Sequence, residues 1–134
     1  MKTLVLATPE QEAGFSLIFP RRPFLHISSA QELQLWLPQA QLVFDFLLHE
    51  QPGRLSQYNA AGAGKELLVF CQADKPQLEA MMTAYGPAHY HLCGINSLAE
   101  MVQKGTLEVS VLHEEDKALV EKAFTYWGTL YELV

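Results

Sequence analysis

The sequence is short of charge, and above all of positive charge. Charged residues make up 18% of its 134 residues, and nine Lys and Arg stand against fifteen Asp and Glu, which gives a formal net charge of −6 at pH 7. Soluble domains carry about 25% charged residues. Without a basic stripe to neutralise phosphates, electrostatics do not support nucleic-acid binding. Few charges favour burial of surface against a partner, so we expect a homodimer or another protein partner.

Long hydrophobic runs, a cysteine framework and a leader sequence are also missing. No apolar run reaches the roughly 18 residues of a membrane span, and the start Met1–Leu4 lacks the apolar core and cleavage site of a signal peptide. Two cysteines, Cys71 and Cys93, cannot build a disulfide framework. These absences predict a cytoplasmic protein without membrane contact. At about 100 to 200 residues per domain, the length predicts one domain over residues 1–134.

Short apolar runs alternate with segments of helical period along the sequence. The runs typical of buried strands are 4–7, 24–28, 42–48, 67–71, 89–95, 107–112 and 130–134. The segments with helical patterns are 30–37, 52–62, 75–82 with Gly86 as its end, 97–104 and 114–126. This alternation predicts a three-layer, doubly wound α/β fold with a mainly parallel sheet of about seven strands and helices on both faces. Such sheets bind ligands beyond the carboxyl ends of their strands.

From Val43 onward, several segments resemble a known family in their order and spacing. They are the run VFDFLLHE at 43–50, the Gly94-Ile95-Asn96 turn, the strand Leu107-Glu108-Val109, and the helix and strand at 115–134. Together they resemble the NAD-binding Rossmann domain of 3-hydroxyacyl-CoA and 3-hydroxybutyryl-CoA dehydrogenases. The resemblance implies a Rossmann-like fold, an NAD cofactor and hydride transfer on a 3-hydroxyacyl-CoA. We expect the sequence to lack the family's second, helical domain, which closes over the acyl-CoA.

The residues that would hold the cofactor are largely missing. A dinucleotide site needs G-x-G-x-x-G after the first strand, so that backbone N–H groups can approach the pyrophosphate. Residues 8–14 read TPEQEAG and keep only Gly14, while Glu10 and Glu12 would bring negative charge to that phosphate. The second strand ends in Ser28-Ser29 where the family has an acid that bonds the ribose. We therefore expect no cofactor, and NAD only if the site is functional.

The catalytic pair that the resemblance implies is half present. The family uses a His oriented by a Glu, and its motif reads His, two aromatics, Asn-Pro. Aligned on Asn96, the Glu is Glu108, and Cys93 replaces the His. A thiol with a pKa near ~8.5 is a poor substitute for an imidazole near ~6.5. His91 is an alternative base if it lies on the same strand face. The candidate catalytic residues are therefore Glu108 and Asn96.

Two further motifs allow a chemical and a structural interpretation. His89, His91 and Cys93 alternate on one strand and, with Cys71 on the preceding strand, could form a zinc site. Their spacing lacks the close pairs of zinc motifs, which favours packed core residues and no metal. The segment Gly62–Lys65 resembles part of a phosphate loop, but it precedes a strand, which favours a helix end and turn.

Asp45 and a C-terminal aromatic group allow two interpretations as well. Asp45 interrupts an apolar strand, where a carboxylate has a raised pKa unless it is paired, and a hydrogen bond to the neighbouring loop is favoured. The aromatic group comprises Phe124, Tyr126, Trp127 and Tyr131. Helical spacing places Phe124 and Trp127 on one face, which favours the core over a contact surface.

Three functional hypotheses follow. The first is a stand-alone, degenerate domain of the 3-hydroxyacyl-CoA dehydrogenase type, without efficient dehydrogenase activity and with a binding or assembly role. The second is a working oxidoreductase, or an acyl-CoA or nucleotide binder, whose site is completed by a partner or a second protomer. The third is an inert structural remnant, which a ligand groove plugged by Phe15, Ile18 or Phe19 would favour.

Overall fold

The computed structural model describes residues 1–19, 23–85 and 89–134. The strands are β1 (Thr3–Leu6), β2 (Leu25–Ile27), β3 (Leu42–Asp45), β4 (Leu68–Gln72), β5 (His91–Ile95), β6 (Glu108–Ser110) and β7 (Glu132–Leu133). The helices are α1 (Pro9–Ile18), α2 (Ala30–Trp36), α3 (Arg54–Gly62), α4 (Lys75–Tyr85), α5 (Leu98–Lys104) and α6 (Asp116–Trp127), with a 3₁₀ helix η1 (Leu37–Gln39). Within the described residues, no helix is long and apolar enough to cross a membrane.

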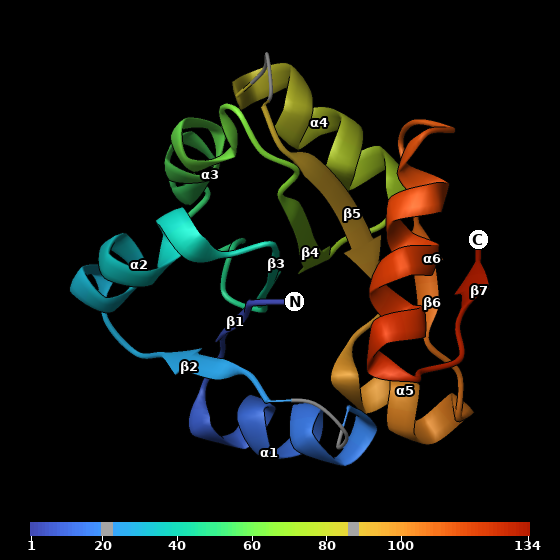
Figure 1. Ribbon diagram of the computed structural model, residues 1–134. Coiled ribbons are helices and arrows are strands. Elements are labelled where there is room, and N and C mark those ends of the chain that lie inside the picture. The colour runs from blue at the N-terminus through green and yellow to red at the C-terminus, as the bar shows by residue number, and fades with distance from the viewer. Residues whose placement is uncertain (20–22, 86–88) are drawn as a thin grey trace.

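The strands in the described part of the chain form one seven-stranded sheet in the order β2-β1-β3-β4-β5-β6-β7 (Figure 1). The pairs from β2 to β5 are all parallel. Strand β6 runs antiparallel to β5, and β7 runs parallel to β6. The winding of the chain reverses at β1, which lies between β2 and β3. The predicted fold class, a doubly wound Rossmann-like α/β fold with a mainly parallel sheet, is confirmed.

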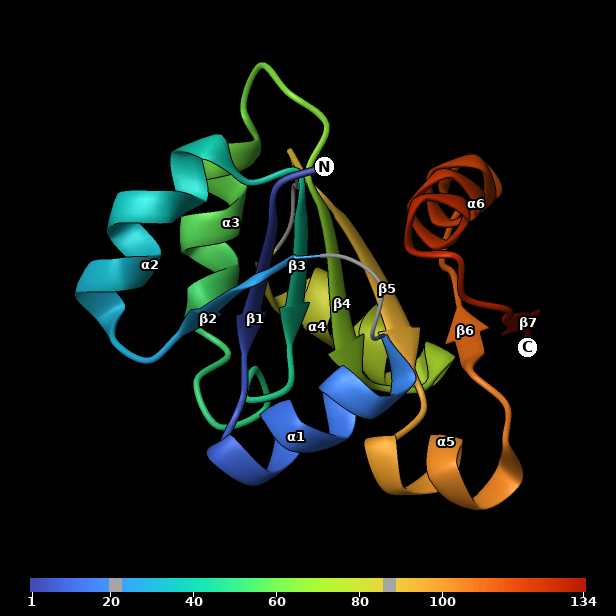
Figure 2. The same cartoon turned by 60° about the horizontal axis from the view of Figure 1, so that its bottom comes forward.

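Helices cover both faces of the sheet (Figure 2). Helices α1, α5 and α6 pack against one face, and α2, α3 and α4 pack against the other. Successive residues of each central strand alternate between the two layers, so that Phe44 and Phe70 face α1 while Val43 and Val69 face α3. Both faces of β3 and β4 are buried, which explains why these strands are continuous apolar runs in the sequence.

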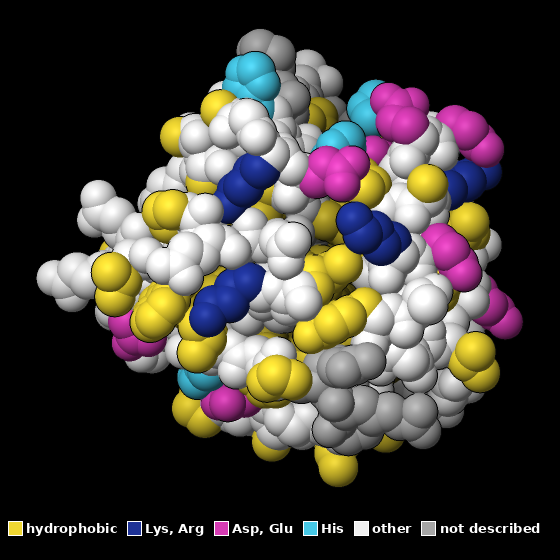
Figure 3. All heavy atoms as spheres, viewed as in Figure 1, with side chains coloured by type: hydrophobic (Ala, Val, Ile, Leu, Met, Phe, Trp, Pro, Cys, Tyr) yellow, Lys and Arg dark blue, Asp and Glu magenta, His cyan; other side chains and the backbone are white. Residues whose placement is uncertain are grey.

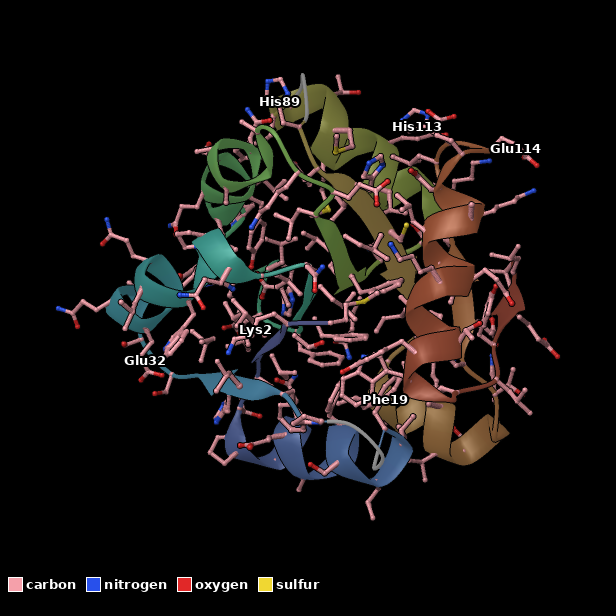
Figure 4. The ribbon with its side chains drawn as sticks, in the orientation of Figure 1. Lys2, Phe19, Glu32, His89, His113 and Glu114 are labelled. Carbon is pink, nitrogen blue, oxygen red and sulfur yellow. The ribbon has the colours of Figure 1, made fainter. Side chains whose placement is uncertain are left out.

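An aromatic cluster fills the layer beneath α1 and α6. The Phe15 and Phe44 ring centroids lie 5.0 Å apart, and those of Phe19 and Trp127 lie 5.8 Å apart. Trp127 and Phe124 are each only 1% exposed, so their predicted place in the core is confirmed. Phe19 lies between α1 and the lower end of α6 in Figure 4. Phe15 and Phe19 are thus core residues that pack on a face of the sheet.

Helix α1 was not expected from the sequence pattern. Thr8 caps its N-terminus: the Thr8 hydroxyl accepts a hydrogen bond from the Gln11 backbone N–H, and the Gln11 side chain accepts one from the Thr8 backbone N–H. Pro9 stands at the first helical position, where its missing N–H is not needed. The helix forms because Phe15 and its neighbour Phe19 reach the sheet, although most other positions are exposed.

Several predicted boundaries are wrong in an informative way. The run at 42–48 is a strand only to Asp45, because the Asp45 side chain accepts a hydrogen bond from the Leu47 backbone N–H at 3.0 Å and turns the chain. Phe46 and Leu48 remain buried after that turn. The expected turn at Gly94-Ile95-Asn96 begins only at Asn96, since Gly94 and Ile95 belong to β5. The expected helix end at Gly86 lies outside the described residues.

Candidate functional site

A pocket of about 400 Å³ opens where strands β4 and β5 end. Its lining residues are Gln72, Ala73, Asp74, Gln77, Ile95, Asn96, Ser97, Glu100, Glu108, Ser110 and Val134. This is the edge where ligands bind in doubly wound sheets. Asn96 and Glu108, the candidate catalytic residues from the sequence, both line this pocket.

Asn96 and Glu108 are held together by backbone hydrogen bonds between the ends of β5 and β6. The Glu108 backbone N–H donates to Asn96 Oδ1 at 3.0 Å, and the Asn96 backbone N–H donates to the Glu108 carbonyl at 3.2 Å. Asn96 Nδ2 donates to the Thr106 carbonyl at 3.0 Å. The amide of Asn96 therefore fastens the antiparallel strand β6 to β5, which is a structural use of both its polar atoms.

The Glu108 carboxylate is engaged by a lysine. Lys104 Nζ lies 3.1 Å from Glu108 Oε1 and 3.7 Å from Glu100 Oε2. The hydrogen bond and charge of Glu108 raise the pKa of Lys104. No imidazole of the described residues lines this pocket, so Glu108 has no His to orient there.

Cys93, at the position of the family's base, lies inside the protein. Its side chain is 0% exposed and packs in the cluster with Phe70, its register partner on β4. Burial, together with the charge of Asp116, raises the pKa of the Cys93 thiol well above its ordinary value. A thiol that is shielded from solvent and protonated at neutral pH cannot accept a proton from a substrate.

His91 does not replace Cys93 as a general base. His91 begins β5, whereas Asn96 follows its last residue, and five residues of strand span ~16 Å. Its Nδ1 atom lies 2.8 Å from Asp116 Oδ1, and that carboxylate is 1% exposed. The imidazole is therefore directed to α6, at the opposite end of the strand from Glu108.

The turn between β1 and α1 has few groups that could bind a phosphate. The cap of Thr8 and Gln11 already satisfies backbone N–H groups of the first turn, and the first turn carries Glu10 and Glu12. Glu12 contacts His26, whose Nδ1 lies 2.8 Å from the carboxylate and whose Nε2 lies 2.9 Å from the Ala7 carbonyl. This bridge links α1, β1 and β2 across the place where a pyrophosphate would sit.

Two serines and a small pocket lie at the ends of β1, β2 and β3. Ser28 donates a hydrogen bond to the Glu32 carboxylate and Ser29 accepts one from the Glu32 backbone N–H, so both hydroxyls are engaged with α2 and neither supplies the paired acceptors of a carboxylate. A pocket of about 230 Å³ lies beside them and includes Arg54. Sequence reasoning did not single out Arg54, because its partner Asp45 is nine positions away on another element.

Asp45 is the centre of a buried polar cluster. Arg54 donates to it from Nε and Nη2, each at 2.8 Å, and the Tyr58 hydroxyl donates at 2.6 Å. Burial lowers the pKa of Arg54, but the hydrogen bond and charge of Asp45 outweigh it and leave the pKa raised. Burial, then the charge of Asp45, raises the pKa of Tyr58 well above 10.0. The expected hydrogen bond from the neighbouring loop is confirmed through Leu47, and the arrangement locks β3 to α3.

The remaining motifs are placed as structural elements. Lys65 Nζ donates to the carbonyls of Leu37, Pro38 and Ala40, at 2.9, 3.0 and 2.7 Å, so the Gly62–Lys65 segment closes η1 and is no phosphate loop. Cys71 and Cys93 pack in opposite layers of the sheet, which rules out a shared zinc ion or redox pair. His89 lies at the outer end of the segment before β5 (Figure 4).

Cys71 gives the protein a pH-dependent stability. Burial, with the charge of Asp45, raises the pKa of Cys71 from 9.0 to about 12. The folded state therefore holds a proton that the unfolded chain releases, and this contribution is complete below pH 9 and is lost as the pH rises towards 12. We expect the free energy of unfolding, from urea titrations under reducing conditions, to fall by up to about 1.4 kcal/mol per pH unit in that window. A Cys71→Ala variant with an unchanged pH slope would contradict this.

Comparisons with known proteins identify a similar fold but do not assign the chain to a family. No protein-family model matches the chain, and no curated protein matches it. A solved structure of a Mycobacterium avium 104 protein, described provisionally as an oxidoreductase, is similar with a TM-score of 0.56 and 10% sequence identity. The match covers 98% of this chain and 56% of that one, so the chain spans just over half the length of the solved structure. The similarity shows a shared Rossmann-like fold.

Proposed function

We propose that this chain is a degenerate nucleotide-binding-type domain related to 3-hydroxyacyl-CoA dehydrogenases, without efficient dehydrogenase activity and with a binding role. The observation that carries the proposal is the burial of Cys93 at the position of the general base. A base needs hydrogen-bond reach to the substrate proton, and a side chain with 0% exposure has none. Mutation of the base to a thiol could be compensated by a nearby imidazole, but His91 is held at the other end of β5 by Asp116.

The lost cofactor site supports the same proposal. Three features disfavour a dinucleotide: the self-capped start of α1, the carboxylate of Glu10 beside it, and the two engaged serines after β2. Each removes a contact that dinucleotide sites use, namely free N–H groups, a neutral glycine turn and a ribose acceptor. The fold that this chain shares with a provisionally described oxidoreductase is compatible with such an origin.

Hydride transfer tests the proposal directly. We expect no oxidation of NADH in the presence of acetoacetyl-CoA above the rate without protein, because neither a base nor a cofactor site is formed. In calorimetric titrations, we expect NAD and NADH to bind no more tightly than roughly 100 μM. Absorbance at the NADH band and the heat of titration are the two measurements.

Measurable turnover would contradict the proposal. Turnover that disappears in a Glu108→Ala variant would favour the second hypothesis, an oxidoreductase whose site is completed by another chain. A matched control is Glu114→Ala, because Glu114 pairs with Lys117 much as Glu108 pairs with Lys104, but on the start of α6. Turnover lost equally in both variants would indicate a contaminating enzyme or a general loss of folding.

A further inference from the structure

The pocket between β4, β5 and β6 is lined by a serine whose hydroxyl makes no hydrogen bond within the described residues. Ser110 lines the pocket and is 7% exposed, and among the described residues its hydroxyl makes no hydrogen bond. Its oxygen is not among the buried side-chain atoms that lack a partner, so it is accessible from the pocket, where water or a ligand can pair with it. The neighbour Val109 packs into the core, so strand alternation places Ser110 and Glu108 on the other face of β6, towards this pocket.

The order of the strands places Ser110 deeper than Glu108. Because β6 runs antiparallel to β5, Ser110 pairs with Gly94 inside the sheet, whereas Glu108 bonds Asn96 just beyond the end of β5. The Ala73 carbonyl oxygen fills the space above Gly94, because it lies 2.0 Å from the position that a Cβ atom would take. The hydroxyl of Ser110 therefore stands towards the base of the pocket, and the carboxylate of Glu108 stands at its mouth.

The charge around the mouth is negative. Asp74, Glu100 and Glu108 line the pocket, and no Lys, Arg or His is among its lining residues. Lys104 contacts two of these carboxylates from outside the lining, which leaves an excess of negative charge. Asp74 and Glu100 are exposed, while Glu108 is partly buried, so a ligand in contact with Glu108 would feel its charge most strongly. A phosphate or carboxylate ligand is disfavoured.

The acidic character extends beyond this pocket. A neighbouring pocket of about 580 Å³ shares Gln72 and Ser97 with it and reaches Glu10 on α1. Figure 3 shows further acidic side chains, interspersed with basic ones, over the start of α6, but these lie at the opposite end of β5 from this pocket and do not add to its charge. The edge of the sheet that binds anions in dinucleotide-binding proteins is therefore suited to cations in this chain.

An ammonium group fits this donor set better than a metal ion does. Within the described residues, no group of three or more His, Cys, Asp or Glu side chains stands close enough to hold a metal. A primary ammonium has three N–H donors and needs only a few separate acceptors, such as a hydroxyl and a carboxylate. Lys104 already presents such a group to Glu108 at 3.1 Å. The apolar surface of Ala73 and Ile95 suits a short alkyl stem.

We propose that this pocket binds the primary ammonium group of a small aliphatic amine, which donates to the Ser110 hydroxyl and to the Glu108 carboxylate. The ligand deepens the binding role under the proposed function and rests on it, since a working dehydrogenase would need the same edge of the sheet for anions. A lysine side chain of another protein carries the same chemical group. Ser110 lies deep in the pocket, and a lysine side chain that reached it would also bring the backbone of its own protein to the pocket mouth. A free amine carries no such backbone and is therefore the favoured ligand.

Titration of the full chain with 1,4-diaminobutane, followed by amide chemical shifts at constant ionic strength, tests the proposal. We expect saturable shifts at Asn96, Ser97 and Ser110, and at least a tenfold weaker affinity in Glu108→Gln and in Ser110→Ala. Glu114→Gln is the matched control, because it removes a lysine-paired carboxylate far from the pocket and is expected to bind as the parent does. 1,4-Butanediol, which has the same length and no charge, is expected to cause no saturable shifts.

The possible results distinguish a free amine from a lysine side chain as the ligand, and they distinguish failure of this ligand from failure of the proposed function. Nα-acetyl-lysine methylamide that binds more tightly than the diamine would overturn a free amine as the source. No saturation by millimolar diamine, or an equal loss in Glu114→Gln, would overturn the site. Should Ser110→Ala fail to fold, Glu108→Gln still decides, because its side chain is at the mouth. NADH binding in the separate titration would refute the proposed function, whereas diamine failure without NADH binding would refute only this ligand.

Discussion

A Gly94→Ala variant is expected to be strongly destabilised. A Cβ atom at this position would lie 2.0 Å from the Ala73 carbonyl oxygen and 3.0 Å from its carbon. Both are backbone atoms, and Ala73 is held between β4 and the start of α4, so the contact cannot relax by a side-chain rotation. We expect a loss of about 3 kcal/mol or more in the free energy of unfolding, measured by urea titration.

Gly14→Ala is the matched control for that substitution. Gly14 lies inside α1, and a Cβ atom there would meet only Leu98 carbon atoms at 3.7 and 3.8 Å, which is ordinary contact. Alanine is the better helix former, so we expect Gly14→Ala to raise stability by roughly 0.5 to 1 kcal/mol. If both variants were equally stable, the close approach of Ala73 to Gly94 would be wrong.

The same comparison bears on the origin of the domain. Gly14 is the only glycine left where a dinucleotide-binding turn has three, and the structure gives it no close neighbour that would exclude a side chain. Gly94, by contrast, belongs to a segment whose resemblance to the dehydrogenases drew attention to it, and here a packing reason requires glycine. Close packing therefore requires glycine at position 94 and does not require it at position 14.

Hydrophobic pattern alone predicts most of the sheet. Strands β1, β3, β4 and β5 are buried on both faces, and each is a run of apolar residues that admits few alternatives in a chain of this length. The antiparallel direction of β6 cannot be derived in this way, because it depends on the Asn96 amide that fastens the strand to β5. Pattern also missed α1, because Phe15 is its one buried residue and most of its other positions are exposed.

The candidate site was harder to predict than the fold, for two physical reasons. The resemblance to the dehydrogenase domain paired Asn96 with Glu108, and the structure places both in one pocket. Sequence reasoning could not weigh Cys93 and His91 correctly, because burial and the pairing with Asp116 depend on α6. Ser110 was overlooked, since a serine in a strand carries no signal until the structure shows that it lines the pocket and makes no hydrogen bond within the described residues.

Replacement of Arg54 by methionine is expected to have a comparably large effect. The two side chains are of similar length, but methionine leaves the Asp45 carboxylate, 1% exposed, without a cation. Asp45 would keep hydrogen bonds from the Leu47 N–H and the Tyr58 hydroxyl, which stabilise it only in part. Removal of one member of a buried ion pair costs roughly 3 to 5 kcal/mol, and we expect a loss of that size in urea titrations.

The double variant Asp45→Asn with Arg54→Met separates the charge from the packing. It removes both charges and keeps an amide oxygen that can accept from Tyr58, so we expect it to be more stable than Arg54→Met alone. A double variant that is no more stable would mean that the loss comes from the packed arginine stem and its bond to Gln51, 2.7 Å long. Arg54 also lines the small pocket beside Ser28. Asp45 binds one edge of the guanidinium through Nε and Nη2, and Gln51 binds Nη1, so a large stability effect would show that this arginine fastens β3 to α3.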